Sequence, residues 1–141
     1  MSDLYDLRRF VAAQDAHGTY EAALAELRAG RKTSHWMWFV FPQAAGLGRS
    51  AMAQKYAIAD LGEARAYLAH ATLGPRLREA AEAMLANAGT ASAEAVLGAV
   101  DALKLRSSMD LFAQAASEAG NDEDAALFRE VLAAFPETAG G

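Results

Sequence analysis

The chain has 141 residues but no cysteine, only three prolines and few β-branched side chains. Without cysteine it can form no disulfide and no cysteine-ligated zinc site. Valine, isoleucine and threonine together number only eleven, too few for a sheet-rich domain, because these side chains favour strands. The densest apolar run, residues 36–41, is far shorter than the ~20 residues of a membrane-spanning helix, so no membrane association is expected.

The chain also lacks an overall positive charge and an N-terminal apolar segment of signal length. Its formal net charge is −5 and its pI is about 5.1. An acidic protein is not drawn as a whole to nucleic acid, so we expect no nucleic-acid partner. The first fifteen residues hold acids instead of an apolar run, and the expected location is therefore cytoplasmic.

Alanine is what the chain has in abundance. It accounts for 36 residues, and hydrophobic residues make up 53% of the chain. Alanine costs a helix less than any other residue, and a domain of this length can bury a sizeable core. The composition and the helical spacing of apolar residues predict an all-α fold. We expect a compact single-domain bundle of about six to eight short-to-medium helices over residues 1–136, followed by a mobile C-terminal tail over residues 137–141.

Local signals mark where the predicted helices begin and end. The expected helices cover residues 3–15, 19–30, 34–41, 50–56, 60–69, 74–86, 92–118 with an interruption near residue 98, and 121–135. Side chains that accept hydrogen bonds from a first helical turn are typical of helix starts. Four residues of that type that open expected helices are Ser34, Ser50, Asp60 and Asn121. These positions predict the helix boundaries.

The charge is unevenly distributed along the chain. Residues 28–78 contain eight basic and two acidic residues, a local charge of +6. The flanking stretches, residues 1–27 and 79–141, carry −3 and −8. Clusters of arginine and lysine attract phosphates and carboxylates, so the middle third is a candidate anion-binding region. The alternative is that its cations pair with the protein's own acidic helices.

Residues 34–50 combine aromatic side chains with a glycine-containing loop. Four aromatic residues in the six positions 36–41 cannot all face one side of a helix. The segment is therefore either a helix wrapped by its neighbours or the wall of a ligand pocket. Gly46 and Gly48 precede a predicted helix start, where backbone N–H groups can face an anion. An ordinary tight turn is the alternative for these glycines.

Two residues are candidates for chemistry. His35 is the candidate general base, because its imidazole enters the aromatic segment beside potential hydroxyl and cation partners. The alternative for His35 is a core or capping role. Lys104 shares a predicted helical face with Ser108, an arrangement that suits a nucleophile and its base. The alternative for Lys104 is an ordinary ion pair with Asp101 on a solvated face. The histidines are dispersed and no cofactor motif is found, so neither a metal nor a cofactor is predicted.

Several short motifs occur together in this chain, among them Ser34–Trp38, Phe41–Gln43, Gly46–Gly48 and Ser107–Met109. Through these motifs the sequence resembles a bacterial family called domain of unknown function 1810, over nearly its whole length. Asp110 departs from the family's pattern, which usually has threonine there. The resemblance implies a compact, mainly α-helical single domain. It implies no established reaction, substrate or catalytic residue.

The first functional hypothesis is a pocket for a small anionic ligand, phosphorylated or nucleotide-like, with or without catalysis. The catalytic candidates are His35 and Lys104. The ligand-binding candidates are Trp36, Trp38, Gln43, Gly46, Gly48, Arg49, Ser50, Tyr56, Ser107 and Ser108. The second hypothesis is a protein–protein interaction or scaffold module that uses residues 36–41 as an exposed anchor, and it leaves a partner protein or a homo-oligomer open. The first requires residues 34–56 and 101–108 to converge around one cavity.

Overall fold

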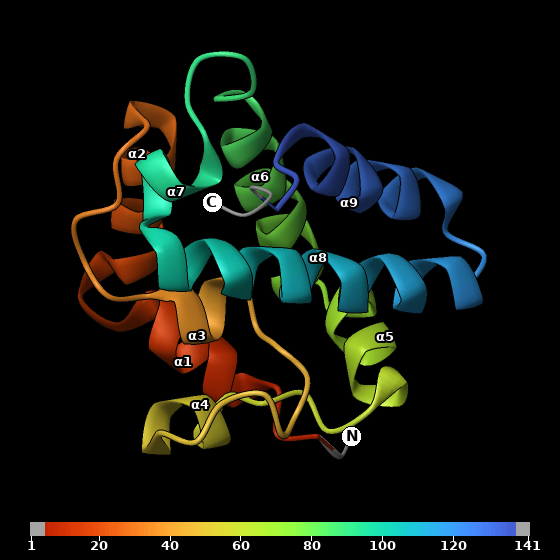
Figure 1. The fold of residues 1–141 in the computed structure, drawn as a ribbon. Coiled ribbons are helices and arrows are strands. Elements are labelled where there is room, and N and C mark those ends of the chain that lie inside the picture. Colours follow the sequence, from red (N-terminus) through yellow and green to blue (C-terminus); the bar gives the residue numbers. More distant parts are fainter. Residues whose placement is uncertain (1–4, 138–141) are drawn as a thin grey trace.

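The computed structural model describes residues 5–137, and within them it shows helices and no strand (Figure 1). The all-α prediction is thereby confirmed. An isolated bridge between Ala44 and Ile58 is the one β-type pairing in this part of the chain. The elements follow in the order α1 (Arg8–Asp15), a 3-10 turn (Ala16–Gly18), α2 (Thr19–Ala29), α3 (Met37–Val40), α4 (Ala51–Lys55), α5 (Leu61–Ala69), α6 (Leu73–Leu85), α7 (Ala93–Leu97), α8 (Ala99–Glu118) and α9 (Asp122–Ala134).

The long helix α8 crosses the middle of the molecule and contacts α3, α5, α7 and α9 (Figure 1). A chain of aromatic rings links it to its neighbours. Tyr67 lies between Phe10 and Phe112, at centroid distances of 5.1 Å and 5.2 Å, and Phe128 follows at 6.2 Å from Phe112. All four rings are fully buried. Burial of these large apolar surfaces is the main force that holds α1, α5, α8 and α9 together.

Three of the predicted capping residues act as caps. The side chain of Ser50 accepts from the Ala53 N–H at 3.1 Å, that of Asp60 from the Glu63 N–H at 2.9 Å, and that of Asn121 from the Asp124 N–H at 3.2 Å. Each satisfies a backbone donor that the first turn leaves without a helical partner. The predicted interruption is also confirmed, since Gly98 separates α7 from α8 with φ of +91°.

Three predicted starts differ from the structure. Ser34 caps no helix, because its hydroxyl donates to the Glu26 carboxylate at 2.5 Å, and α3 starts only at Met37. The first helix begins at Arg8 because Asp6 has a φ of +53°, which a right-handed helix does not allow. The sixth begins at Leu73, earlier than the proline signal indicated, because Nδ1 of His70 accepts from the N–H groups of Thr72 and Leu73.

Among the described residues, no helix is both long enough and apolar enough to cross a membrane. The predicted tail falls outside the described residues except for Glu137.

Candidate functional site

A groove of about 410 Å³ lies between the loop that precedes α4 and the first half of α8. We call it the α4–α8 groove. Six of the residues predicted from sequence line it, and they come from two segments more than fifty positions apart. The lining residues are Gln43, Leu47, Gly48, Arg49, Ser50, Ala53, Val100, Leu103, Lys104 and Ser107. The predicted convergence of the two segments is therefore seen for these six.

Backbone contacts fix the loop that forms one wall of the groove. The Ile58 N–H donates to the carbonyl of Gln43, and the Ala45 N–H donates to the carbonyl of Ile58, both at 2.8 Å. Beyond this pairing the loop turns closely against α4. A Cβ atom on Gly48 would lie 2.6 Å from the Cβ of Ala53, a distance that real side chains do not tolerate. Gly48 is thus required for the loop to meet α4.

The groove holds more positive than negative charge. Arg49 is exposed and makes no ion pair with the described residues. Lys104 places its Nζ 3.4 Å from Oδ1 of Asp101 and 5.2 Å from the centroid of the Trp38 ring. Asp101 also lies 3.0 Å from the Nζ of Lys32, so one carboxylate serves two ammonium groups. An anion entering the groove would meet Arg49 and an incompletely neutralised Lys104.

The rim of the groove is apolar. Leu47, Val100 and Leu103 are 59%, 67% and 51% exposed, and Met52 on the adjoining helix α4 is 36% exposed. No other large hydrophobic residue in the described part of the chain is exposed. Isolated apolar residues on a surface are ordinary, but a group of them around one hollow is typical of a binding site. This rim was not predicted from sequence, because helical spacing alone does not reveal which apolar positions stay uncovered.

The aromatic segment lies inside the protein. Trp36 and Phe41 are fully buried, and Met37, Phe39 and Val40 are nearly so. Only Trp38 of residues 36–41 keeps an intermediate exposure, under Lys104. The segment therefore cannot serve as an exposed anchor, and that form of the interaction hypothesis is wrong.

Tyr56 is likewise a core residue. Its ring packs 5.7 Å from that of Phe10 and 5.3 Å from that of Phe39. Neither Tyr56 nor Trp36 lines the groove. The structure thus places these two predicted ligand-binding residues in the core, because a large ring next to an apolar core gains more free energy from burial than from a wet surface.

One carboxylate organises the loop that enters the aromatic segment. Glu26 accepts hydrogen bonds from the backbone of Thr33 and Ser34, from the Ser34 hydroxyl and from Nε1 of Trp36 at 2.9 Å. Burial raises the pKa of this carboxyl, but the hydrogen bonds from Ser34, Trp36 and Thr33 outweigh burial and lower the pKa to about 2. Glu26 is thus a structural anion that stabilises the turn between α2 and α3.

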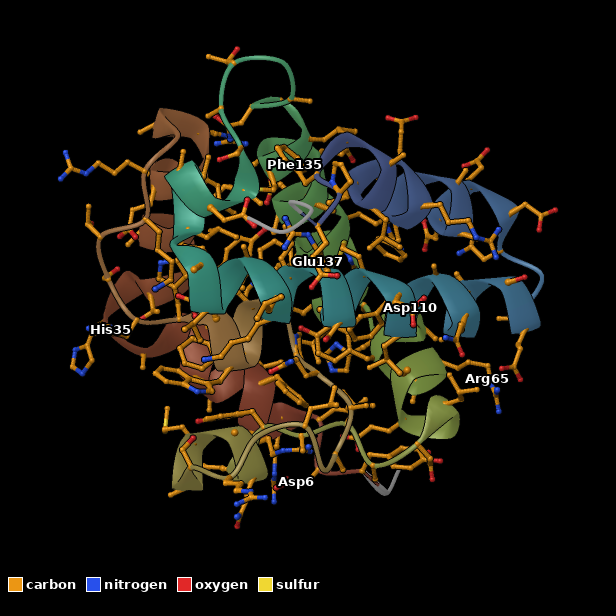
Figure 2. All side chains as sticks on the ribbon, viewed as in Figure 1. Asp6, His35, Arg65, Asp110, Phe135 and Glu137 are labelled. Atoms are coloured by element: carbon orange, nitrogen blue, oxygen red, sulfur yellow. The ribbon has the colours of Figure 1, made fainter. Side chains whose placement is uncertain are left out.

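Three further candidates lie apart from the groove. The side chain of His35 is exposed and points away from the body of the molecule (Figure 2). Gly46 occupies an exposed turn with φ of +92°. Ser108 is fully buried, and its Oγ has no hydrogen-bond partner among the described residues. None of the three lines the groove.

The start of α4 offers little to an anion through its backbone N–H groups. Helix α4 has only five residues, and its Ala53 N–H already donates to the Ser50 side chain. The groove's attraction for an anion has to come from side chains.

Most cations of the basic middle third are paired within the protein. Five of the eight lie close to carboxylates, at distances between 2.8 Å and 3.7 Å. The pairs are Arg28–Glu79, Lys32–Asp101, Arg65–Glu118, Arg76–Asp15 and Arg78–Asp124. The other three, Arg31, Arg49 and Lys55, make no ion pair with the described residues. The self-pairing alternative therefore accounts for most of the +6 charge, but it leaves Arg49 in the groove.

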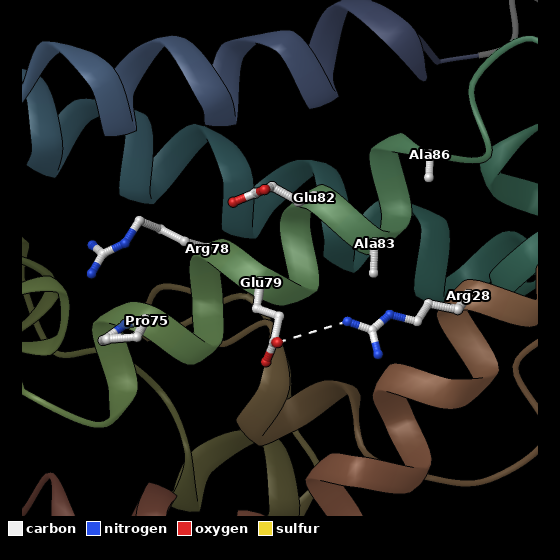
Figure 3. Close-up of a pocket in the computed structure, with 7 residues that line it drawn as sticks. All are labelled: Arg28, Pro75, Arg78, Glu79, Glu82, Ala83 and Ala86. Atoms are coloured by element: carbon white, nitrogen blue, oxygen red, sulfur yellow. Dashed lines mark ion pairs between the residues drawn. The ribbon is translucent and has the colours of Figure 1, made fainter.

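A larger pocket of about 560 Å³ lies between α2 and α6, and none of the sequence candidates lines it (Figure 3). Most of the charged side chains that line it already form ion pairs within the protein. Arg28 lies 3.7 Å from Glu79, and Arg78 lies 2.8 Å from Asp124. A ligand there would have to displace these internal pairs, so size does not make this pocket the stronger candidate. Within residues 5–137 no three histidine, aspartate or glutamate side chains are grouped to hold a metal ion.

A buried polar network around Gln14 was also not predicted. Gln14 donates to the carbonyl of Phe39 and to the hydroxyl of Tyr67, and it accepts from Arg76. Burial raises the pKa of Tyr67, and burial together with a hydrogen bond to Glu79 raises that of Tyr20, in both cases above the usual tyrosine range. Both phenols stay neutral and act as hydrogen-bonding groups that join α1, α2, α5 and α6.

The fold defines a small all-helical protein. Its surface carries a groove that is lined by both polar and apolar side chains. The family model described as "Protein of unknown function (DUF1810)" matches residues 4–139, so the chain belongs to that family. A similar solved structure is the conserved hypothetical protein Rv1873 from Mycobacterium tuberculosis. It is 47% identical, with a TM-score of 0.84, and the match covers 94% of this chain and 89% of that chain. The comparison with curated proteins gave no match. The family resemblance and the helical fold expected from sequence are confirmed.

Proposed function

We propose that the α4–α8 groove binds a small organic anion. The observation that carries this proposal is the meeting of Arg49, which has no ion-pair partner among the described residues, with Lys104 from a distant segment. Arginine and lysine on one hollow supply charge-assisted hydrogen bonds to a phosphate or a carboxylate. The overall charge of −5 does not oppose this, because the lining of the groove itself contains two cations and no carboxylate.

The polar and apolar lining indicates the chemistry of the ligand. Gln43, Ser50 and Ser107 offer an amide and two hydroxyl groups beside the two cations. Leu47 and Leu103 offer an apolar surface next to them. A phosphorylated or carboxylated molecule with an apolar or sugar-like body fits this combination. A nucleotide base would need an aromatic face for stacking, and Trp38 is half-buried outside the lining, so nucleotides rank below simpler organic phosphates.

The proposal is for binding and not for catalysis. His35, the candidate base, is exposed and lies outside the groove. Nζ of Lys104 lies against the Asp101 carboxylate and the Trp38 ring, contacts that suit charge recognition. A cytoplasmic location and the absence of a nucleic-acid partner are part of the same proposal. They are supported by the acidic, cysteine-free composition.

A panel of ligands in thermal denaturation tests the proposal. The panel contains inorganic phosphate, phenyl phosphate, sugar phosphates, nucleotides and aromatic carboxylates. A ligand at a hundred times its Kd stabilises the folded state by about 2.7 kcal/mol, so we expect a clear rise in Tm with at least one organic anion. The variant Arg49→Gln should abolish most of that rise.

The matched control is Arg31→Gln, which removes another exposed and unpaired cation outside the groove. It should leave the rise in Tm unchanged. If both variants reduce the rise equally, the ligand responds to overall charge and not to this groove. If no anion in the panel raises Tm, the proposed function is contradicted.

A further inference from the structure

The α4–α8 groove does not end at Ser107. A second hollow of about 470 Å³ adjoins it, and Leu47 and Ser107 line both. The second hollow lies between the start of α5 and the middle of α8. The two together form one elongated groove beside α8.

One face of α8 forms the floor of this elongated groove. The lining runs from Val100 through Lys104, Ser107 and Asp110 to Gln114. These positions are three or four residues apart, the spacing of one helical face. With a rise of 1.5 Å per residue, the lined face is about 21 Å long. A small organic anion would occupy only one part of such a length.

The two hollows of the elongated groove carry opposite charges. Arg49 and Lys104 line the first hollow. Asp60 and Asp110 line the second, and both are exposed. On α8, Lys104 and Asp110 are six positions apart, which is about 9 Å along the helix axis. The Asp110 carboxylate accepts one hydrogen bond from Gln114 at 3.0 Å and makes no ion pair with the described residues. The rest of the shared lining is apolar, with the exposed Leu47 and the half-buried Leu61 and Leu111.

We propose that this elongated groove docks an extended peptide segment of a partner protein, about six residues long, in which an acidic and a basic residue stand three positions apart among apolar residues. The inference rests on the proposed function in the first hollow, where the acidic residue would take the place of the small anion. An extended chain advances ~3.3 Å per residue, so six residues match the length of the lined face, and three residues match the ~9 Å between Lys104 and Asp110 along α8. Complementary charges in the two hollows would fix the register and the direction of the peptide.

Calorimetric titration with two capped hexapeptides tests this inference. The first has glutamate and lysine at its second and fifth positions and leucine or alanine at the others, made in both directions. The second has glutamate at both of these positions. Exposed charge pairs contribute up to ~1 kcal/mol, so the wild-type protein should bind the first peptide about two- to fivefold more tightly than the second. The variant Asp110→Lys should reverse that preference.

Glu130→Lys is the matched control, because it makes the same charge change at an exposed position of α9 that lines neither hollow. It should leave the preference as in the wild type. The inference is overturned if Asp110→Lys does not change the ratio of the two affinities, or if neither direction of the first peptide binds below about 1 mM. It is also overturned if the protein alone forms a dimer that buries the groove.

Phenyl phosphate separates this failure from a failure of the proposed function. If phenyl phosphate binding is lost in Arg49→Gln and kept in Asp110→Lys while no peptide binds, the small-anion proposal stands and the peptide inference falls. If neither phenyl phosphate nor peptide binds, both fall.

Discussion

Residues 34–42 and residues 43–50 are neighbours in the chain, but the fold uses them in opposite ways. The first stretch packs inward, with Trp36 and Phe41 fully buried. The second forms a wall of the α4–α8 groove through Gln43, Gly48 and Arg49. The first is rich in large apolar rings, whose burial stabilises the fold. Apart from the exposed Leu47, the second consists of small, polar and charged residues, which cannot fill a core. The comparison teaches that the conspicuous aromatic motif supports the site without being part of it.

The largest expected effect comes from the buried stretch. Trp36→Ala removes a fully buried ring and the hydrogen bond that its Nε1 donates to Glu26. Such a truncation costs about 3–5 kcal/mol of unfolding free energy. The matched change Leu47→Ala in the second stretch should cost no more than ~0.5 kcal/mol, because that side chain is 59% exposed and touches little of the core. Urea denaturation followed by circular dichroism measures both, and similar losses would contradict the comparison.

An intermediate effect is expected at Gly48, where the groove wall meets α4. Gly48→Ala places a Cβ 2.6 Å from that of Ala53, and such overpacking costs about 1–3 kcal/mol. Ala53→Gly removes the clashing atom, although glycine inside a helix costs about 1 kcal/mol itself. We expect the double variant to be more stable than the sum of the two single losses predicts. Strict additivity in urea denaturation would show that the two residues are not in contact.

A smaller effect is expected from the pH dependence of Glu26. Its pKa in the folded protein is lowered from 4.5 to about 2, so its stabilising contribution is complete above pH 4.5 and is lost as the pH falls towards 2. Because the side chain is partly exposed to solvent, we discount the contribution to about 1–2 kcal/mol. The wild type should therefore lose more unfolding free energy than Glu26→Gln between about pH 5 and pH 2.5. Parallel pH profiles of the two proteins would contradict this.

The smallest effect is expected at Lys104, on the groove side. Lys104→Gln removes the ion pair with Asp101 and the contact with the Trp38 ring. Each is worth at most ~1 kcal/mol at a partly exposed position, and Asp101 keeps its pair with Lys32. We expect a loss below ~1 kcal/mol and a change in tryptophan fluorescence. Arg31→Gln, which lies near no tryptophan contact of this kind, should change neither quantity.

Much of the fold was predictable because its signals are local. The abundance of alanine set the class, and Ser50, Asp60 and Asn121 marked helix starts by a hydrogen bond to a residue three positions ahead. Ser34 has the same local signal and failed. The carboxylate of Glu26, eight positions earlier, accepts the hydrogen bonds that this loop donates. No local sequence pattern reveals such a tertiary contact.

Residues of the site could be predicted only where the charge pattern or the glycine-containing loop indicated them. Gln43, Gly48, Arg49 and Ser50 meet Lys104 and Ser107 as expected. The aromatic character of ligand pockets predicts Trp36 and Tyr56 in the site, but core packing needs the same residue type. The exposed rim of Leu47, Val100 and Leu103 could not be seen in the sequence, since their exposure depends on what the rest of the chain leaves uncovered.

A solution NMR titration with phenyl phosphate tests the central claim that the α4–α8 groove, and not the larger pocket between α2 and α6, is the binding site. The account predicts that amide signals of Gly48, Arg49 and Ser50 shift together with those of Lys104 and Ser107, and that Arg49→Gln removes these shifts. Shifts confined to the lining of the α2–α6 pocket, around Arg28, Glu79 and Glu82, would contradict it. The absence of any shift at saturating phenyl phosphate would contradict it equally.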